Sequence, residues 1–497
     1  MAKQQYLTSP PKITTMPPGV PYIVGNEAAE RFSYYGMNSI LTVFMTKYLL
    51  DRMGHLSVMP AASAEAWYHT FVSTLYFLPI LGAVLADAVF GKFWVVFWLS
   101  IVYCGGHLTL ALMGSPVAHT IEPRYLLAVG LLLIALGAGG IKPCVSTNVG
   151  DQFGESNKHL LTRVFNWFYF SINAGSAIST LLIPWLLAPF KASPDLAAKL
   201  SPALLHFLES PRLHSPDVAF GLPGVFMALA TLVFWLGRKK FVHIPPVGLR
   251  KYGREVFNRR TGKILLNLLM PVPFVAMFWA LWQQNFSSWI VQAESLDRHL
   301  FGINWLSSQI QTVNPLFILI MLPLFSYWVY PAVEKVVRLT PLRKIGAGLF
   351  VTAASFLIVA MIQTRIDGGA HPPVIWQIWA FVVLTVAETL VSPTHLEFSY
   401  TQGPVNLKSL CMCTYLFAIS LGNVFTAGVN FFIQNPDGTV KLQGAHYFMF
   451  FVWVMLGTAV LFLLVSPFYK GRTYLQDQTE VTGEAEPAGG FAIQPEV

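Results

Sequence analysis

Long apolar runs separated by short polar connections dominate this chain. A run of roughly 20 mostly apolar residues is long enough to cross a membrane as a helix. Twelve such runs occur, near residues 22–50, 67–89, 93–113, 124–148, 163–189, 218–236, 264–290, 308–332, 342–363, 375–401, 408–433 and 444–468. The pattern predicts an all-α membrane protein with twelve transmembrane helices.

Composition agrees with lipid as the solvent. The 497 residues are 54% hydrophobic and 11% charged, which is far more apolar than a water-soluble domain requires. The first nineteen residues contain no apolar stretch of signal-peptide length, so we expect the first hydrophobic segment to remain as a helix. The four cysteines lie in or beside apolar runs and are expected to be reduced packing residues, namely Cys104, Cys144, Cys411 and Cys413.

Basic residues in the connections predict the orientation. The connection between the sixth and seventh runs is rich in Lys and Arg, and the next even-to-odd connection adds Lys335, Arg338, Arg343 and Lys344. Because basic connections stay in the cytoplasm, both termini are expected there. The net charge of +8 then reflects topology and contact with anionic lipid headgroups, not nucleic-acid binding.

The basic connection also divides six spans from six. We therefore expect an N-terminal six-helix half at 1–237, a basic cytoplasmic linker at 238–263, a C-terminal six-helix half at 264–470 and a disordered cytoplasmic tail at 471–497. This layout is typical of transporters built from two repeated halves around a midplane site. In the outside segment 190–217, the leucines at 196, 200, 204, 205 and 208 suit a short amphipathic helix on the outer surface.

Ionisable residues inside the predicted spans are the candidates for function. Each costs about 2.5 to 3.5 kcal/mol at a helix centre and therefore needs a reason. Glu27, Glu30 and Arg31 lie on one face of the first span, and Lys142 lies at a similar depth on the fourth, so two acids can face two bases. The alternative is that paired charges here only fix the helix register.

Glu388 is different, because no basic residue lies within two turns of it on the tenth span. It needs a partner on another helix, a ligand or a proton, and a carboxyl balanced between burial and a nearby cation can exchange protons. His69, at the outer end of the second span, is equally compatible with proton gating and with interfacial packing. Asn173 on the fifth span must bond another helix or a ligand, because a buried amide without partners is costly.

Several motifs resemble those of the proton-dependent oligopeptide transporter family, a branch of the major facilitator superfamily. They are EAAERFSYYG from residue 27, YHTFVSTLY from 68, GAVLADAVFGKFWVV from 82, GGIKPCVS around 142, FYFSINAGS around 173, VNP from 313, and ETLVSP and LEFSY on the tenth span. The similarity extends over essentially all twelve spans. It implies the major facilitator fold, and it makes Asp87 a conformational latch at a helix end; the alternative is an ordinary helix-end carboxylate.

The resemblance also implies roles for individual residues. Proton coupling would involve Glu27, Glu30, Arg31, Lys142, Glu388 and His69. The amino terminus of a peptide would be held by Asn173, Asn314 and Glu388, and the pocket would be lined by Tyr35, Tyr76, Trp289 and Ser392, with Lys142 also contributing to substrate binding. A zwitterionic peptide needs a carboxylate near one end and a cation near the other, which agrees with these charges.

Two pocket positions depart from the family pattern. Asn38 stands where most peptide-transporting members have arginine, and Gln283 stands where they have a carboxylate. We expect these two residues to face each other across the outer gate, with a neutral hydrogen bond in place of an ion pair. The replacement removes one of the two cations expected near a peptide carboxylate.

These observations predict a proton-coupled symporter that imports di- and tripeptides by alternating access. The alternatives are a carrier of another small solute, such as nitrate, an amino acid derivative or a modified peptide, and more remotely a channel or receptor. The sequence offers neither a nucleophile with its base nor a set of metal ligands, so we expect no enzyme, and no cofactor other than the coupling proton. The protein is expected to be a monomer in the cell (inner) membrane.

Overall fold

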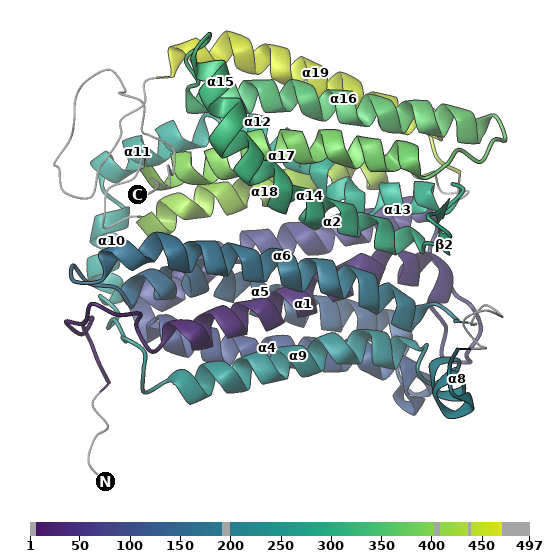
Figure 1. Ribbon diagram of the computed structural model, residues 1–497, viewed down its shortest axis with the longest axis horizontal. Helices are drawn as coiled ribbons and strands as arrows, with labels where there is room; N and C mark the ends of the chain where they lie inside the picture. Colours follow the sequence, from purple (N-terminus) through teal and green to yellow (C-terminus); the bar gives the residue numbers. More distant parts are fainter. Residues whose placement is uncertain (1–5, 191–198, 402–407, 436–438, 470–497) are drawn as a thin grey trace.

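The computed structural model describes residues 6–190, 199–401, 408–435 and 439–469. Long helices that run side by side along one direction make up most of the molecule (Figure 1). Two short strands, β1 (His299–Leu300) and β2 (Ile303–Asn304), pair in antiparallel fashion in one connection.

The first half of the chain forms six helical spans. They are α1 (Val20–Val43) with the π-helical turn η1 (Phe44–Tyr48); α2 (Ala61–Phe77), α3 (Pro79–Val84) and η2 (Leu85–Phe90); α4 (Lys92–Ala111); α5 (Pro123–Asp151); α6 (Leu161–Leu187); and α9 (Pro216–Gly237). Short 3-10 turns lie at Leu112–Gly114, Pro116–His119 and Lys158–Leu160.

The second half forms six more spans. They are α12 (Val272–Trp282), η6 (Gln283–Phe286) and α13 (Ser288–Ala293); η7 (Ser307–Thr312), α14 (Val313–Leu324), η8 (Phe325–Val329) and α15 (Tyr330–Glu334); α16 (Pro341–Asp367); α17 (Ile375–Thr401); α18 (Lys408–Phe432); and α19 (Ala445–Val465), with the turn Ser466–Phe468. Shorter helices are α8 (Pro202–Leu208) and α10 (Leu249–Val256), which lie in connections, and α11 (Arg259–Leu269), which directly precedes α12.

Every predicted span corresponds to one of these helical segments. Ten segments among the described residues are long and apolar enough to cross a membrane, and an eleventh is added if Thr261–Leu269 and Val272–Ala293, bent by 46°, count as one span. The remaining span is α1 with η1, whose first half carries Glu27, Glu30 and Arg31. The prediction of an all-α membrane protein is confirmed, and the bend between α11 and α12 lies at Pro271 and Pro273.

The spans pack as two groups. In the first, α4 packs on α5, α1 packs on α6, and α9 packs on both α1 and α4; in the second, α16 packs on α17 and α19, and α12 packs on α18. The groups meet where α2 packs on α18 and where α6 packs on α14 and η7. In Figure 1 the first group fills the lower part of the view and the second fills the upper part.

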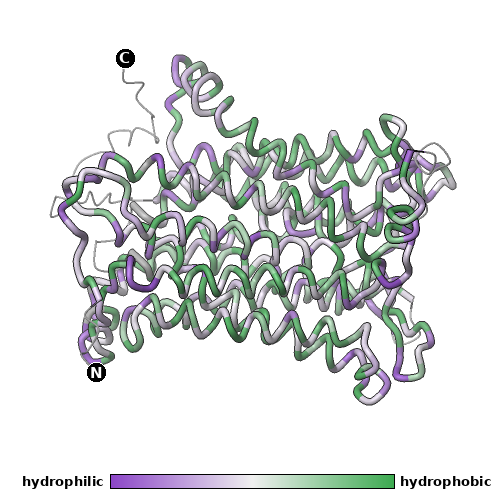
Figure 2. The backbone as a smooth tube through the Cα atoms, turned by 60° about the horizontal axis from the view of Figure 1, so that its bottom comes forward, coloured by the Kyte–Doolittle hydropathy of each residue, from purple (hydrophilic) through white to green (hydrophobic). Residues whose placement is uncertain are grey.

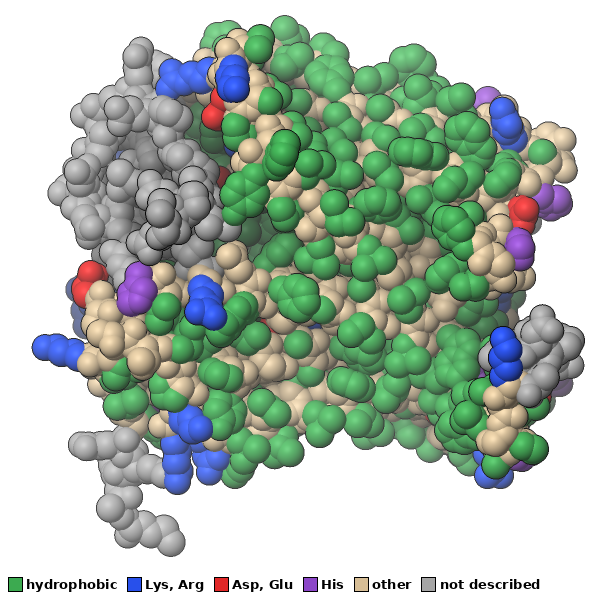
Figure 3. Space-filling view, in the orientation of Figure 1, with side chains coloured by type: hydrophobic (Ala, Val, Ile, Leu, Met, Phe, Trp, Pro, Cys, Tyr) green, Lys and Arg blue, Asp and Glu red, His purple; other side chains and the backbone are tan. Residues whose placement is uncertain are grey.

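The bundle has two chemically distinct ends. One end carries α10 and α11 and is called the linker end below; the opposite end carries α8 and β2 and is called the loop end (Figure 1). Hydrophilic positions gather at both ends of the tube in Figure 2, and the visible face in Figure 3 is largely hydrophobic between them. An apolar belt between polar ends is what a bilayer requires of a protein that spans it.

Close helix contacts depend on glycine. A Cβ on Gly422 of α18 would collide with the backbone carbonyl of Ala276 on α12, and a Cβ on Gly175 of α6 would lie 2.7 Å from the carbonyl oxygen of Ala28 on α1. Gly175, two residues after Asn173, therefore allows α6 to approach α1 closely. Gly91, at φ 81°, makes the tight turn between η2 and α4.

The structure describes part of the predicted surface helix in 190–217 but not the predicted C-terminal tail. The segment 190–217 does contain a helix, α8, and it includes three of the five predicted leucines; Leu200 precedes it, and Leu196 lies outside the described residues. The predicted tail at 471–497 also lies outside the described residues. All four cysteines are free thiols, as predicted.

Candidate transport site

A buried cluster on α1 contains two carboxylates that both contact one guanidinium group. Arg31 Nε lies 2.7 Å from Glu27 Oε1 and 2.9 Å from Glu30 Oε2. The spacing of these residues along the helix brings all three side chains to one face, as the sequence predicted. Because the three side chains are nearly inaccessible to water, their charges are weakly screened and strongly interdependent.

Lys142 of α5 lies beside this cluster without closing an ion pair. Its Nζ lies 4.5 Å from the ring centroid of Tyr34 and 5.1 Å from that of Tyr76. The ammonium is within electrostatic range of Glu27, Glu30 and Arg31, but none of the ion pairs within 4.0 Å among the described residues includes it. Two bases thus face two acids, as expected, but only Arg31 is in contact with the carboxylates, and Lys142 lies against the aromatic rings.

Glu388 of α17 finds its partners on two other helices. Asn314 of α14 donates from Nδ2 to Glu388 Oε2 at 2.7 Å, and Trp282 of α12 donates from Nε1 to the same oxygen at 3.0 Å. Asn314 also donates to Thr385 Oγ1 at 3.2 Å, which fixes its orientation. Both donors are neutral, and none of the ion pairs among the described residues includes Glu388. The carboxyl group is held in position and has no cationic partner among the described residues.

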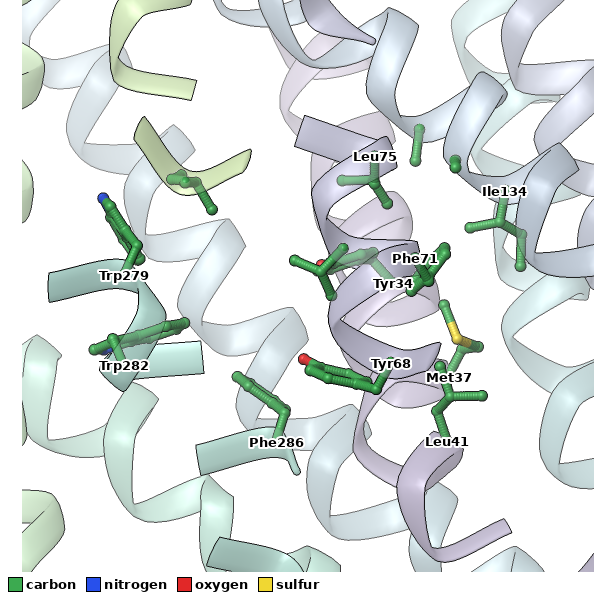
Figure 4. Close-up of a cluster of buried hydrophobic side chains, with 14 of the residues drawn as sticks. Tyr34, Met37, Leu41, Tyr68, Phe71, Leu75, Ile134, Trp279, Trp282 and Phe286 are labelled. Carbon is green, nitrogen blue, oxygen red and sulfur yellow. The ribbon is translucent and has the colours of Figure 1, made fainter. Parts of the chain in front are cut away.

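Aromatic side chains occupy the space between the two charged regions. Tyr35 of α1 is within electrostatic range of both Arg31 and Glu388, and its ring stacks on Phe286 at 6.2 Å between centroids. Figure 4 shows Trp279, Trp282 and Phe286 of the second half facing a cluster of the first half that includes Tyr34, Tyr68 and Phe71. The site is therefore an aromatic space with a guanidinium and an ammonium on one side and a carboxylate on the other.

The other predicted pocket residues have mixed surroundings. Ser392 lies close to Glu388 on α17, and its Oγ is 2.9 Å from Tyr415 Oη. Asn173 donates to the carbonyl oxygen of Tyr169, four residues earlier in its own helix, at 3.0 Å. Trp289 is fully buried and its ring contacts those of Phe356 and Phe381 of the second half, and its place in the pocket stays a prediction. A different tryptophan, Trp282, contacts the carboxylate.

His69 lies at the contact between the halves, near the loop end. Its Nδ1 is 2.7 Å from Asn423 Oδ1 on α18, and its Nε2 is 2.9 Å from Ser287 Oγ, at the junction of η6 and α13. The ring is completely buried. Both ring nitrogens of His69 form hydrogen bonds with the other half, so the residue contributes to closure of this end. This position is compatible both with proton gating and with interfacial packing.

Asn38 and Gln283 are not hydrogen-bonded to each other, contrary to expectation. Both are buried, and Asn38 Oδ1 has no hydrogen-bond partner. The ion pair that does join the halves, among the described residues, lies nearer the loop end on the same two spans, between Lys47 of η1 and Glu294 after α13. The charged pair between the halves therefore lies closer to the loop end than Asn38 and Gln283, the positions at which the family pattern has charged residues.

Asp87 lies in η2 at the linker end, as predicted for a latch. Its backbone carbonyl accepts a hydrogen bond from the amide of Val247 in the connection between the halves, at 2.9 Å. Nearby, Lys92 Nζ lies 2.6 Å from Asp151 Oδ2 and ties the start of α4 to the end of α5. The latch role remains a prediction, and the Lys92 to Asp151 pair is a contact that the sequence reading missed.

Trp282, Tyr415, Asn423 and Ser287 are site residues that the sequence reading did not single out. Each is an ordinary aromatic or polar residue in an apolar span, where such residues also serve plain packing. Their partners lie on other helices, so no local spacing could have paired them. Only the buried polar type of Asn423 carried a usable signal, because an amide in lipid needs a partner.

Comparison with known proteins shows the family to which the chain belongs. The profile of the POT family matches residues 93–259 and 249–447. The chain belongs to the POT family. Solute carrier family 15 member 2 of Rattus norvegicus is 35% identical over 433 residues, which cover 78% of this chain and 55% of that protein. Peptide transporter 3 of Caenorhabditis elegans is 32% identical over 405 residues, covering 74% and 54%. The chain thus spans about half the length of the curated relatives it matches.

Solved structures of POT proteins share the whole fold. The POT family transporter PepTSo is 31% identical, with a TM-score of 0.76, and the match covers 92% of this chain and 99% of that one. An auto-inhibited POT family peptide transporter is 29% identical with the same TM-score, covering 94% and 99%. The twelve helices therefore form the major facilitator fold, in a family of transporters and not of enzymes.

Proposed function

We propose that this POT family member imports di- and tripeptides together with protons, by alternating access between its two halves. The observation that carries the proposal is Glu388, a buried carboxylate whose two hydrogen-bond donors are neutral. An uncompensated carboxylate in an aromatic pocket is suited to binding an ammonium group, and the peptide amino terminus is such a group. Arg31 and Lys142 supply cations on the other side of the pocket for the peptide carboxylate.

Alternating access is supported by the asymmetry of contacts between the halves. Among the described residues, hydrogen bonds from one half to the other concentrate toward the loop end, as in Thr42 to Phe286, Thr180 to Thr312 and Gln311 to Ser39. Toward the linker end, in the part of the chain that the structure describes, Cys413 Sγ lies 3.9 Å from the carbonyl oxygen of Pro79. This arrangement corresponds to a transporter closed at its loop end.

The orientation and setting follow from charge. The linker end carries the basic connection between the halves, so we place that end and both termini on the cytoplasmic side of a cell (inner) membrane. The loop end then faces outward, and the protein works as a monomer surrounded by lipid. Protons are its coupling ion, and no other cofactor is needed.

The energetics of coupling are sufficient for accumulation. One proton that enters down about 100 mV releases roughly 2.3 kcal/mol, and each pH unit adds about 1.36 kcal/mol. Two pH units, about 2.7 kcal/mol, therefore sustain a gradient of roughly a hundredfold for a zwitterion, and one unit with the membrane potential, about 3.7 kcal/mol, sustains roughly five hundredfold. Uptake with net proton entry should be electrogenic.

The test is uptake by proteoliposomes under an imposed gradient. Purified protein is reconstituted with an acidic exterior and an inside-negative potential, and radiolabelled dialanine is offered with a protonophore as control. We expect accumulation that collapses when the protonophore is added. Dialanine uptake that ignores both voltage and pH would contradict proton symport.

The second candidate function is transport of another small solute. Asn38 and Gln283 are both neutral and buried, which leaves the region near the peptide carboxylate with less positive charge than the family pattern provides. Nitrate, amino acid derivatives and modified peptides are therefore offered in the same assay. Accumulation of one of these in place of dialanine would favour the second candidate.

A further inference from the structure

Four polar contacts form a seam between α2 of the first half and the second half, where they involve α18, Gln434 directly after it, and Tyr447 of α19. From the loop end inward they join Ser63 to Gln434 at 2.6 Å, Glu65 to Asn430 through Tyr447, His69 to Asn423 at 2.7 Å, and Ser73 to Ser420 at 2.9 Å. The two helices run in opposite directions, so residue numbers rise along α2 as they fall along α18. This seam holds the loop end closed.

Glu65 is the carboxyl group of this seam, and the transport site described above does not use it. Its side chain is 6% exposed, and Tyr447 Oη on α19 donates to Glu65 Oε2 at 3.2 Å. Asn430 Nδ2 in turn donates to Tyr447 Oη at 3.1 Å, so the hydroxyl accepts one hydrogen bond and gives its only hydrogen to Glu65. The carboxyl thus receives one neutral donor, which comes from the other half of the protein.

Charged groups around Glu65 have other partners. Titratable groups on the elements that pack against α2 or contact Glu65 include Tyr68, His69 and Tyr76 on α2; His446 and Tyr447 on α19; Cys411, Cys413 and Tyr415 on α18; Lys47 and Tyr48 on η1; Glu27, Glu30, Arg31, Tyr34 and Tyr35 on α1; Arg124, Tyr125, Lys142, Cys144 and Asp151 on α5; and Glu294 after α13. Lys47 pairs with Glu294, Arg31 pairs with the carboxylates of its own helix, and Lys142 lies over Tyr76, toward the other end of α2. None of the ion pairs among the described residues includes Glu65.

Burial without a cation makes the charge on Glu65 dependent on the state of the gate. An ionised carboxyl that is removed from water and given one neutral hydrogen bond is much less stable than a protonated one. Separation of the halves at the loop end would break the bond to Tyr447 and admit water to the carboxyl. Closure therefore favours the protonated group, and opening favours the ionised group.

We propose that Glu65 is a further proton-binding residue, which takes up a proton from outside when the loop-end gate closes. The proposal rests on alternating access as set out under Proposed function. Because closure binds a proton, a lower pH favours the closed gate, and the closed-to-open ratio changes by up to about tenfold per pH unit in the titrating range. The proton at Glu65 thus reports gate closure, separately from substrate binding at Glu388.

The experiment measures gate closure directly. Met53 and Phe301, which lie in loop-end connections of the two halves and are 80% and 88% exposed, are replaced by cysteine and spin-labelled. Distances between the labels are recorded across pH in detergent or liposomes without substrate, and protein without the added cysteines gives the background. We expect a shorter distance to gain population as pH falls.

Two variants separate titration from simple loosening. Glu65→Gln should remove the pH-dependent part of the profile, up to tenfold per unit, and leave the closed state populated at high pH. Ser63→Ala, the matched control, removes a neutral contact between the same two helices and should shift the closed fraction at every pH while it keeps the slope. A wild-type slope in Glu65→Gln, or a flat profile in the unmodified protein, overturns the proposal.

A second pair of variants guards against misfolding and misassignment. Tyr447→Phe removes the donor to Glu65 but keeps the carboxyl, so the closed fraction at high pH should fall and the pH-dependent range of the closed fraction should widen; an unchanged profile overturns the proposal. His69→Gln should leave the Glu65-dependent slope, and loss of the slope only in His69→Gln would assign the proton to His69 instead. The readout needs no transported solute, so a failure of dialanine uptake would count against the proposed function and not against this inference.

Discussion

Glu388→Gln removes a charge from the pocket and changes little else. The glutamine oxygen can still accept from Asn314 and Trp282, so each hydrogen bond falls from the charge-assisted to the neutral range, at a cost of about 1 kcal/mol each. Relief from burying a charge opposes this loss. We therefore expect the melting temperature to stay within a few degrees of the unmodified protein.

The effect on binding should be much larger. An ammonium about 4 Å from an ionised carboxylate gains about 4 kcal/mol at an effective dielectric constant near 20, which corresponds to roughly a thousandfold in Kd. Glu388→Gln should lose most of this for dialanine. N-acetyl-dialanine has no ammonium, so its already weak binding should hardly change.

The assay compares the two ligands on three proteins. Binding of dialanine and of its N-acetyl derivative is measured calorimetrically for the unmodified protein, for Glu388→Gln and for Asn314→Ala. The Asn314 variant keeps the charge but loses the closer of the two donors, so it should still prefer dialanine. If Glu388→Gln discriminates between the two ligands as well as the unmodified protein does, Glu388 does not bind the amino terminus.

Three further outcomes are expected. Lys142→Ala should stop proton-driven uptake but spare substrate counterflow, since exchange needs no net proton movement; an equal loss of both would mean that Lys142 serves binding or folding. Arg31→Gln leaves two buried carboxylates without their cation, and a thermal unfolding assay should show a loss of about 3–5 kcal/mol; an unchanged melting temperature would contradict the pairing. Gly422→Ala should destabilise the protein by about 1–3 kcal/mol through collision with Ala276, while Gly428→Ala, which meets open space, should not; similar melting temperatures for both would refute the close packing.

The contacts of some charged residues in this site could be predicted from the sequence, and those of others could not. Glu27, Glu30 and Arg31 could be paired in advance, because their spacing alone brings them to one face of a helix. Lys142 could be placed only by depth, and its preference for the rings of Tyr34 and Tyr76 depends on how α5 is rotated against α1 and α2. A helix turns by about 100° per residue, so a small rotation changes which side chains meet.

The sequence by itself determined the membrane class, the position of each span, the charged residues that lipid would penalise, and through its motifs the family. These properties follow from local composition and spacing, because each helix that crosses a bilayer must by itself be apolar enough and satisfy its own backbone hydrogen bonds. Tertiary structure alone decided the partners across the bundle. Asn314 and Trp282 reach Glu388, Tyr447 reaches Glu65 over 382 positions of the chain, and Asn38 does not bond Gln283. Such pairs depend on the crossing and rotation of helices from both halves, which no single segment specifies.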